Sequence, residues 1–355
     1  MSKKKRLAVI GLNQGWKFVT CLMEESDALG AEIAAVCDSV IAHNMPPNSP
    51  DVPVFDNYEA MLEEMRGQID GVICALPNHL HLHVTQLASE MGLAVLMEKP
   101  IAGTLEDAKQ MIQLVNASKI PFMVGHHRRF SAGINRIKEM IDNNMLGRII
   151  AVNLIWTLRK PDNYFDQKWR ITPGAGGPLL INVIHEIDTM LYLVGEIDMI
   201  HSFTSNLNRG FPVEDAGVVN IKFKNSAILS YVFADGIPSK YAYELTAHED
   251  GWFHPMDGDV YYFFGDEGQV SFPSLKLTRY TEECCGNNWL YPLYEETFPV
   301  PRYNPLRGEL ELIVNMINGT GTSKCTAEDA TETLRCVEAI RESAATGKII
   351  CMDDF

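Results

Sequence analysis

Short apolar runs alternate with helical stretches through the first part of the chain, and this alternation constrains the fold more than any other feature. Each run has the pattern of a strand that is buried on both faces. Strands that alternate with helices in this way predict an α/β domain with a parallel, doubly wound sheet. The predicted strands are Leu7–Leu12, Glu32–Asp38, Gly71–Leu76, Leu93–Met97 and Pro121–Gly125.

The first run breaks at Gly11 and leads into a helical stretch from Lys17 to Glu25. A strand, a glycine turn and a helix form the phosphate-binding unit of dinucleotide folds, because the helix N-terminus faces the pyrophosphate. Against the pattern G-x-G-x-x-G, this chain has Asn13 and Trp16 at the second and third glycines, and Gly15 comes one place early. Asn can adopt a left-handed backbone, which would preserve the turn at Asn13.

The second run ends in Asp38, about 20 residues beyond the glycine loop, where dinucleotide folds place the acid that binds the ribose. A carboxylate accepts hydrogen bonds from ribose hydroxyls and repels the 2′-phosphate of NADP. We therefore expect NAD as the cofactor, with NADP less favoured. The alternative is a strand-end Asp that caps the next turn.

Polar residues follow three later runs. The segment Pro77 to His81 follows one, Glu98-Lys99-Pro100 follows the next, and residues 126–130 follow the last. Ligands bind at the carboxyl ends of the strands in an open α/β sheet, so Lys99 is a candidate for chemistry. The alternative is a surface Glu-Lys pair.

The pattern changes near Arg129, where we place a domain boundary, giving domains 1–126 and 127–355. A helix from Ala132 to Asn143 precedes a series of strands without intervening helices, which predicts a largely antiparallel sheet in an α+β domain. The predicted strands cover residues 149–158, 201–206, 217–222, 227–234, 241–247, 261–264, 268–272 and 276–280. Aromatic residues at strand spacing form either an open surface of this sheet or its core: Tyr231, Phe233, Tyr243, Tyr261 and Phe263.

One helix, from Leu179 to Gly195, interrupts this series. Its spacing places Asn182, His185 and Thr189 along one stripe. A histidine in such a place is either a hydrogen-bonded core residue or a catalyst. Two further amphipathic helices, Leu306–Asn318 and Ala327–Thr346, have the pattern of structural elements.

Composition and charge narrow the class of partner. A net charge of -16 argues against nucleic acid and against an anionic membrane, and no segment approaches the length of an apolar membrane span. We expect a cytoplasmic protein with a small-molecule partner. The eight cysteines show no metal-ligand spacing, so we expect reduced thiols, Cys284 and Cys285 included, and no metal site.

The order and spacing of these motifs resemble the Gfo/Idh/MocA family, the glucose-fructose oxidoreductase and inositol dehydrogenase relatives. The resemblance rests on the altered glycine loop, Asp38, Pro77-Asn78-His79, Glu98-Lys99-Pro100 and Arg128-Arg129-Phe130, and it covers nearly the whole chain. It implies a Rossmann domain followed by a domain whose sheet commonly forms a homodimer or homotetramer.

The resemblance also implies roles for particular residues. Lys99 polarises the reacting oxygen, His185 is the general base, and Pro100 is often cis in this family. The implied cofactor-binding residues are Gly11, Leu12, Asn13, Gln14, Asp38, Leu76, Pro77, Asn78, His81, Glu98 and Lys99. The implied substrate-binding residues are His127, Arg128, Trp156, Lys160, Trp169, Asn182 and His185, although Lys160 and Arg170 could instead be solvated surface charges.

Two positions depart from the family's common pattern. Many members carry an Asp four residues before the histidine, where this chain has Ile181, and His127 stands where relatives often have Asn. The first change removes a negative charge from the implied substrate site, and Asn182 could supply a neutral hydrogen bond in its place.

These observations predict an NAD-dependent dehydrogenase that oxidises a secondary alcohol of a sugar, polyol or related derivative. Two alternatives remain. Some relatives keep NAD bound and oxidise a sugar only transiently, to cleave or eliminate at a glycosidic bond. The other alternative is a non-catalytic regulator that binds dinucleotide and a protein partner.

Overall fold

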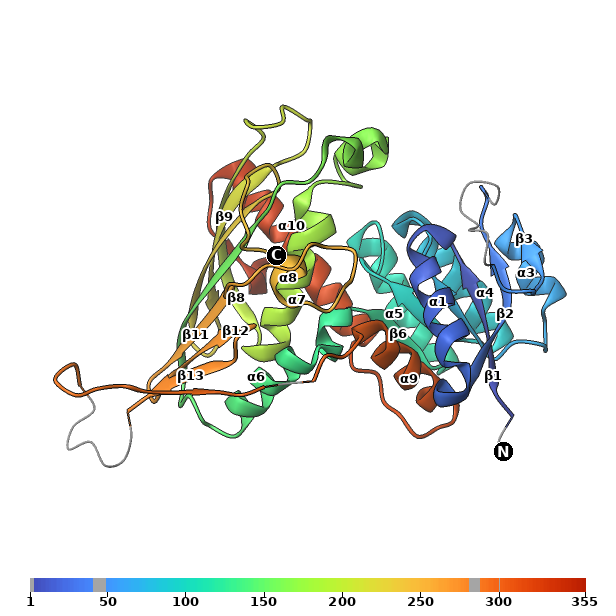
Figure 1. The fold of residues 1–355 in the computed structure, drawn as a ribbon. Helices are drawn as coiled ribbons and strands as arrows, with labels where there is room; N and C mark the ends of the chain where they lie inside the picture. Colours follow the sequence, from blue (N-terminus) through green and yellow to red (C-terminus); the bar gives the residue numbers. More distant parts are fainter. Residues whose placement is uncertain (1–2, 41–48, 281–287, 300) are drawn as a thin grey trace. The chain divides into compact units, whose positions relative to one another are not determined.

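The computed structural model describes residues 3–40, 49–280, 288–299 and 301–355. The chain divides into two compact units, which are described separately below (Figure 1). The first comprises Met1–Phe130 and Pro305–Leu334, and the second comprises Ser131–Asn304 and Arg335–Phe355. The change of unit near residue 130 lies close to the predicted boundary. Residues 305–334 return to the first unit, which the sequence did not predict.

The first unit contains a six-stranded sheet in the order β3-β2-β1-β4-β5-β6, and every strand pair in it is parallel. Each apolar run forms a strand, so the predicted doubly wound sheet is confirmed. The strands are β1 (Lys5–Ile10), β2 (Ala31–Cys37), β3 (Val54–Phe55), β4 (Gly71–Cys74), β5 (Ala94–Glu98) and β6 (Phe122–Gly125).

Helices α1 (Leu12–Leu29) and α9 (Pro305–Ile317) pack against each other in this unit, and α4 (His81–Met91) packs with α5 (Leu105–Ser118) (Figure 1). The buried face of α9 explains why residues 305–334 belong here. Leu310, Ile313 and Val314 lie in one apolar core with residues of β1 and α1. The unit also contains α3 (Tyr58–Glu64).

The second unit contains a nine-stranded sheet in the order β14-β13-β12-β11-β7-β10-β9-β8-β15. Its strand pairs are antiparallel except for β7 with β10, which agrees with the predicted, largely antiparallel sheet. The strands are β7 (Ile149–Thr157), β8 (Ile197–Ser205), β9 (Ala216–Phe223), β10 (Ile228–Ala234), β11 (Tyr261–Gly265), β12 (Gln269–Phe272), β13 (Lys276–Arg279), β14 (Tyr294–Thr297) and β15 (Ile350–Cys351).

The helices of the second unit are α6 (Ala132–Asp142), α7 (Ile184–Leu193) and α8 (Tyr243–Thr246), and α10 (Ala327–Thr346) begins in the first unit and ends here. The strand predicted at Tyr241–Ala247 is wrong, because α8 occupies this position. Tyr243 is buried there and its ring stacks on Phe272, with centroids 5.3 Å apart, so its burial comes from a loop helix and not from a pleat.

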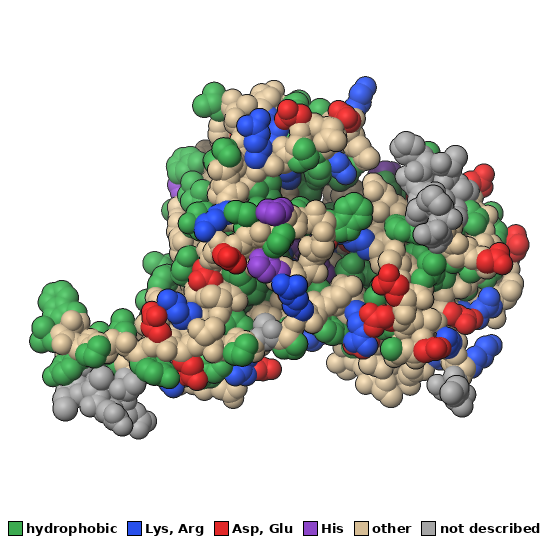
Figure 2. All heavy atoms as spheres, viewed as in Figure 1, with side chains coloured by type: hydrophobic (Ala, Val, Ile, Leu, Met, Phe, Trp, Pro, Cys, Tyr) green, Lys and Arg blue, Asp and Glu red, His purple; other side chains and the backbone are tan. Residues whose placement is uncertain are grey.

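The five aromatic residues considered for an open surface are all buried, so they belong to the core. Other apolar side chains are exposed on the sheet: Phe203 pairs with Val218, and Val218 with Val232. Exposed apolar side chains also gather on the arm that carries β13 and β14, including Trp289 and Leu290 (Figure 2).

No helix among the described residues is long and apolar enough to cross a membrane. Cys21, Cys37, Cys74 and Cys351 are free thiols within the part of the chain that the structure describes. The prediction for Cys284 and Cys285 falls outside the described residues.

Candidate functional site

The glycine turn between β1 and α1 is tighter than the sequence predicted. Gly11 has φ 88°, and a Cβ at this position would lie 2.5 Å from the Ala75 carbonyl oxygen, so only glycine fits. Helix α1 begins directly at Leu12, five residues before the predicted start at Lys17. Its first turn carries no acidic residue, which leaves the helix N-terminus suited to a phosphate.

Gly15 performs the task of the third fingerprint glycine although it comes one place early. A Cβ there would lie 2.9 Å from Cγ1 of Val9, so the glycine allows α1 to pack closely on β1. Asn13 lies within α1 and is not among the residues with positive φ. The left-handed backbone considered for Asn13 is therefore wrong, because the helix has already begun.

Asp38 is buried after β2 and binds two backbone N–H groups. The Leu12 N–H donates to Oδ2 at 2.7 Å, and the Val40 N–H donates to Oδ1 at 2.8 Å. The carboxylate thus lies at the N-terminus of α1, which stabilises negative charge. The alternative considered for Asp38, a strand-end carboxylate that caps the next turn, is therefore confirmed. Each carboxylate oxygen can accept a further hydrogen bond, so ribose binding stays a prediction.

His81 connects the loops that follow β4 and β5. Its Nε2 lies 2.9 Å from the Leu76 carbonyl oxygen and its Nδ1 lies 3.1 Å from the Ile101 carbonyl oxygen. Burial lowers the pKa of the His81 imidazole, which favours the neutral ring. Both ring nitrogens face protein carbonyls in the loops that follow β4 and β5, and a neutral ring can donate to only one of the two. The contact of His81 with the cofactor stays a prediction.

The turn after β5 brings Glu98, Lys99 and Pro100 together. The Lys99 N–H donates to Oε2 of Glu98 at 3.2 Å, and the Lys99-Pro100 peptide bond is cis, as the resemblance implied. Burial raises the pKa of the Glu98 carboxyl, while Lys99 and Lys17 oppose this rise. Lys99 therefore directly follows the carboxyl end of a parallel strand, where ligands bind in this fold class.

Sequence reasoning missed Glu309, on α9. Its side chain is fully buried, and neither carboxylate oxygen has a hydrogen-bond partner among the described residues. A Cβ built on Gly125 would lie 3.4 Å from Oε1 of Glu309 and 3.4 Å from the Met97 carbonyl oxygen, which places this carboxyl at the ends of β5 and β6. Burial raises the pKa of Glu309 well above its usual range, and Glu98 raises it further. The sequence contains one signal that could have identified Glu309, because it is an acid on the apolar face of α9, four residues before Ile313.

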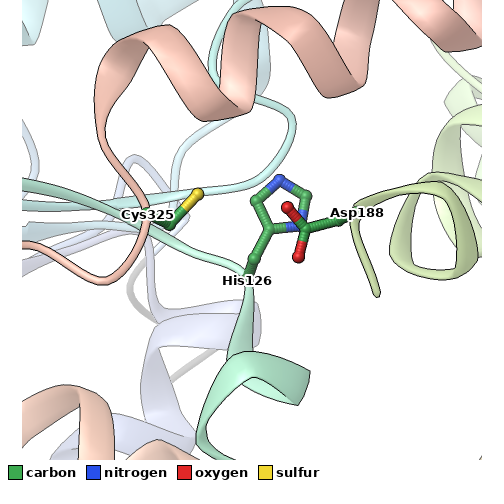
Figure 3. Close-up of side chains that lie close together, drawn as sticks. All are labelled: His126, Asp188 and Cys325. Carbon is green, nitrogen blue, oxygen red and sulfur yellow. The ribbon is translucent and has the colours of Figure 1, made fainter. Parts of the chain in front are cut away.

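The segment after β6 is largely buried, and the predicted substrate-binding roles of His127 and Arg128 stay untested. Arg129 is buried and donates to the Lys324 carbonyl oxygen at 2.7 Å and to Asp329 at 3.3 Å. Figure 3 draws His126 at the end of β6 with Cys325, whose carbonyl oxygen accepts the Val124 N–H at 3.0 Å; Asp188, also drawn, belongs to α7 of the second unit. Arg128 is buried, and the pKa of His127 is well below its usual range because of burial and the nearby Arg128.

In the second unit, Lys160 lies just beyond β7 and is only 7% exposed. Its Nζ donates to Oδ1 of Asn182 at 2.8 Å and lies 3.4 Å from a carboxylate oxygen of Asp235. Burial lowers the pKa of Lys160 to about 8, an effect that Asp235 opposes. The interpretation of Lys160 as a solvated surface charge is therefore wrong. Lys160 lies beside Asn182, another predicted substrate-binding residue, and the substrate-binding role of both stays a prediction.

The two predicted tryptophans differ in environment. Trp156 is fully buried and its Nε1–H donates to Glu244 at 2.8 Å, while its ring centroid lies 5.4 Å from Nζ of Lys160. It can support Lys160 but is enclosed in the core. Trp169 is 46% exposed, its indole N–H donates to the side chain of Gln167 at 3.0 Å, and Cζ of Arg170 lies 5.4 Å from its ring centroid.

The helix with His185 begins as a π-helix, Leu179–Val183, and continues as α7. The wider π turn means that the stripe of Asn182, His185 and Thr189 does not follow one regular α-helical period. His185 is buried, and its carbonyl oxygen accepts the Thr189 hydroxyl at 2.7 Å. Its predicted catalytic role is not tested by these contacts.

Family models match both parts of the chain. Residues 5–126 match an oxidoreductase family with an NAD-binding Rossmann fold, and residues 138–352 match the C-terminal alpha/beta domain of the same family. The chain is 26% identical over 295 residues to 1,5-anhydro-D-fructose reductase from Ensifer adhaerens, which covers 81% of each protein.

Solved structures share the fold over the whole chain. An oxidoreductase from Thermotoga maritima has a TM-score of 0.81 at 22% identity and covers 99% of each chain. The WlbA dehydrogenase from Bordetella pertussis, in complex with NADH and UDP-GlcNAcA, has a TM-score of 0.74 at 21% identity over 98% of each chain. With both domain models matched in sequence order, the chain belongs to the Gfo/Idh/MocA family of NAD(P)-binding oxidoreductases.

Proposed function

We propose that this protein is an NAD-dependent dehydrogenase that oxidises a secondary alcohol of a sugar, a polyol or a related derivative. The observation that carries the proposal is the placement of Lys99 in a turn at the carboxyl end of β5, within a chain whose two domains both match the oxidoreductase family. The names of two relatives add support, since one reduces an anhydro sugar and the other binds NADH with a nucleotide sugar.

The residues of the first unit suit a dinucleotide. The glycine turn excludes side chains, the α1 N-terminus favours phosphate, and Asp38 lies at that same end. Asp38 would hydrogen-bond the ribose hydroxyls and disfavour a 2′-phosphate, so NAD is proposed over NADP. Bound nicotinamide would supply the hydride acceptor.

Two side chains carry the remaining chemistry in this proposal. Lys99 donates a hydrogen bond to the substrate hydroxyl and stabilises the charge that develops on its oxygen. His185 accepts the hydroxyl proton as general base, a role that suits an imidazole near neutral pH. Lys160 and Asn182 bind the substrate in this proposal.

The direct test is NADH formation, followed by absorbance, over a panel of sugars, inositols and sugar acids with NAD saturating. Net NADH with a defined oxidised product supports the proposal. Product that accumulates without net NADH would favour transient oxidation with retained NAD. Dinucleotide binding without any turnover over the whole panel would favour a regulator.

The outer face of the nine-stranded sheet is proposed to join copies of this chain into a homodimer or homotetramer. Phe203, Val218 and Val232 are cross-strand neighbours there with 60%, 37% and 41% exposure, an apolar row that a second copy would cover. Light scattering of wild type and Val218→Lys tests this, and an unchanged mass for the variant would contradict it.

A further inference from the structure

Three basic residues of the second unit line one recess, although the chain as a whole is strongly acidic. Lys160, Arg170 and Arg209 surround it together with Ile181, Glu214 and Asp235. Both Lys160 and Arg170 lie against the ring of Tyr164, with Nζ 4.9 Å and Cζ 3.9 Å from its centroid. The recess therefore holds two cations against one aromatic ring, beside the residue that replaces the family's usual Asp.

The acidic groups around this recess already have donors. Asp235 accepts from Nε of Arg209 at 2.8 Å and lies 3.4 Å from Nζ of Lys160. Glu214 accepts the Leu179 N–H at 2.8 Å, and Glu244 accepts the Trp156 indole N–H. None of these acids needs the guanidinium of Arg170.

Arg170 has guanidinium N–H donors without an acceptor among the described residues. Its Nη1 donates to the Tyr164 carbonyl oxygen at 2.7 Å. Its Nε is buried and has no hydrogen-bond partner among the described residues, and no bond within that part of the chain engages Nη2. Nε and Nη2 form the edge of a guanidinium that binds a carboxylate through two parallel hydrogen bonds. A buried donor without an acceptor is costly, so this edge calls for an acceptor with two oxygens, which reaches it only if the side chains that close the recess move aside.

We propose that the substrate carries a carboxylate, bound by Arg170 with Lys160 beside it, so that the substrate class is a sugar acid and not a neutral sugar or polyol. This inference rests on the proposed function and specifies its substrate. Ile181 agrees with it, because an Asp at that position would repel a carboxylate, whereas Ile adds no charge. Asn182 keeps its amide N–H groups for a substrate hydroxyl, since its Oδ1 already accepts from Lys160.

The test compares matched pairs that differ only in the carboxylate, such as D-glucuronate with D-glucose and D-galacturonate with D-galactose. Each ligand is titrated calorimetrically into NAD-saturated protein, and kcat/KM is measured in parallel. Where a sugar and its acid both bind, we expect the acid to be preferred by at least about tenfold, because a hydrogen bond to a charged group commonly contributes that much. Arg170→Gln should remove that preference and leave affinity for the neutral partner unchanged.

Arg159→Gln is the matched control, because Arg159 is an exposed arginine of the same unit and should leave the preference intact. Carboxylate preference that Arg170→Gln abolishes supports the inference even if no NADH forms, an outcome that would refute the dehydrogenase alone. Three results would overturn the inference. They are a preference for the neutral sugars, no preference for the acid in any pair, and a preference for the acid that Arg170→Gln leaves unchanged.

A pH series gives a second readout that a purely structural arginine would not produce. Lys160 faces Asp235, Glu244, Arg209, Asn182 and the Trp156 ring, and its pKa is about 8. The ammonium is charged below that pH and neutral above it. Affinity for the acid should therefore fall several-fold as pH rises from 7 to 9, while affinity for the neutral partner stays flat. Lys160→Arg should make the profile for the acid flat as well, because arginine stays charged over this range.

Discussion

Replacing Glu309 by Gln should make the stability of the first unit less sensitive to pH. The wild-type carboxyl is fully buried beside Glu98 without a hydrogen-bond partner among the described residues, so it remains protonated in the folded protein well above its ordinary pKa. In the unfolded chain it ionises near pH 4.3. Folding must then keep a proton on Glu309 that the unfolded chain would release.

The sign and slope follow from proton linkage. Below the unfolded pKa both states are protonated, and Glu309 adds no pH dependence. Above it the unfolded state loses its proton while the folded state keeps it, so the free energy of unfolding falls by about 1.4 kcal/mol per pH unit from this group until the folded pKa is reached. Glu309→Gln has no proton to lose. The stability difference between variant and wild type should thus open from about pH 4.5 upward, in favour of the variant.

The assay is urea unfolding of wild type and Glu309→Gln from pH 4 to 8, with a fluorescence probe of the first unit. Glu311→Gln is the control, because Glu311 lies on the same helix and its carboxylate is paired with Arg307 at 2.7 Å. Glu309→Met should be more stable than wild type by about 1–3 kcal/mol near pH 4, since an apolar side chain leaves no unmet polar atoms, and its advantage should grow with pH as that of Glu309→Gln does. Parallel stability profiles for wild type and Glu309→Gln would mean that Glu309 is ionised or paired in solution, and the reasoning would fail.

Three further predictions concern the proposed chemistry. Asp38→Ala should narrow the preference for NAD over NADP and cost about 1 kcal/mol of stability, because two backbone N–H groups lose their acceptor; nucleotide titrations and unfolding curves measure both. Lys99→Ala should leave NAD affinity nearly unchanged and slow single-turnover NADH formation by about a hundredfold or more, equivalent to ~3 kcal/mol, with little rescue by Lys99→Arg. His185→Asn should lower turnover strongly at unchanged NAD affinity and melting temperature, whereas lost stability with turnover per folded molecule intact would indicate a core histidine.

Much of the fold could be predicted because its signals are local. Apolar runs bounded by glycine and proline form strands, and the helices of the first unit follow from their apolar spacing. The failures lie where tertiary contacts override local pattern. Tyr243 has strand-like neighbours, yet its ring is buried by stacking on Phe272 from a short helix. Residues 305–317 have an amphipathic helical pattern, but nothing in that pattern states which unit will bury the face.

The candidate site shows the same division. Lys99, Asp38 and Gly11 could be identified because strand ends and glycine turns mark their own positions in the sequence. Glu309 could not, because its importance comes from the absence of a partner, and only the packed structure shows which acids lack one. Gly15 was misread for a related reason, since its close approach to Val9 depends on where α1 begins.

At Ile181 a signal that is visible in the sequence combines with contacts that only the folded structure shows. The absence of the Asp that the resemblance implies was visible in the sequence, but its consequence depends on Lys160, which lies beyond the end of β7 and donates to Asn182, the neighbour of Ile181. Lys160 faces two acids, Glu244 and Asp235, the second of which it shares with Arg209, and burial lowers its pKa to about 8. A single substitution therefore leaves donors where the family pattern places an acceptor. We therefore expect substrate selectivity in this chain to follow that exchange, with a substrate group that accepts hydrogen bonds favoured beside Lys160.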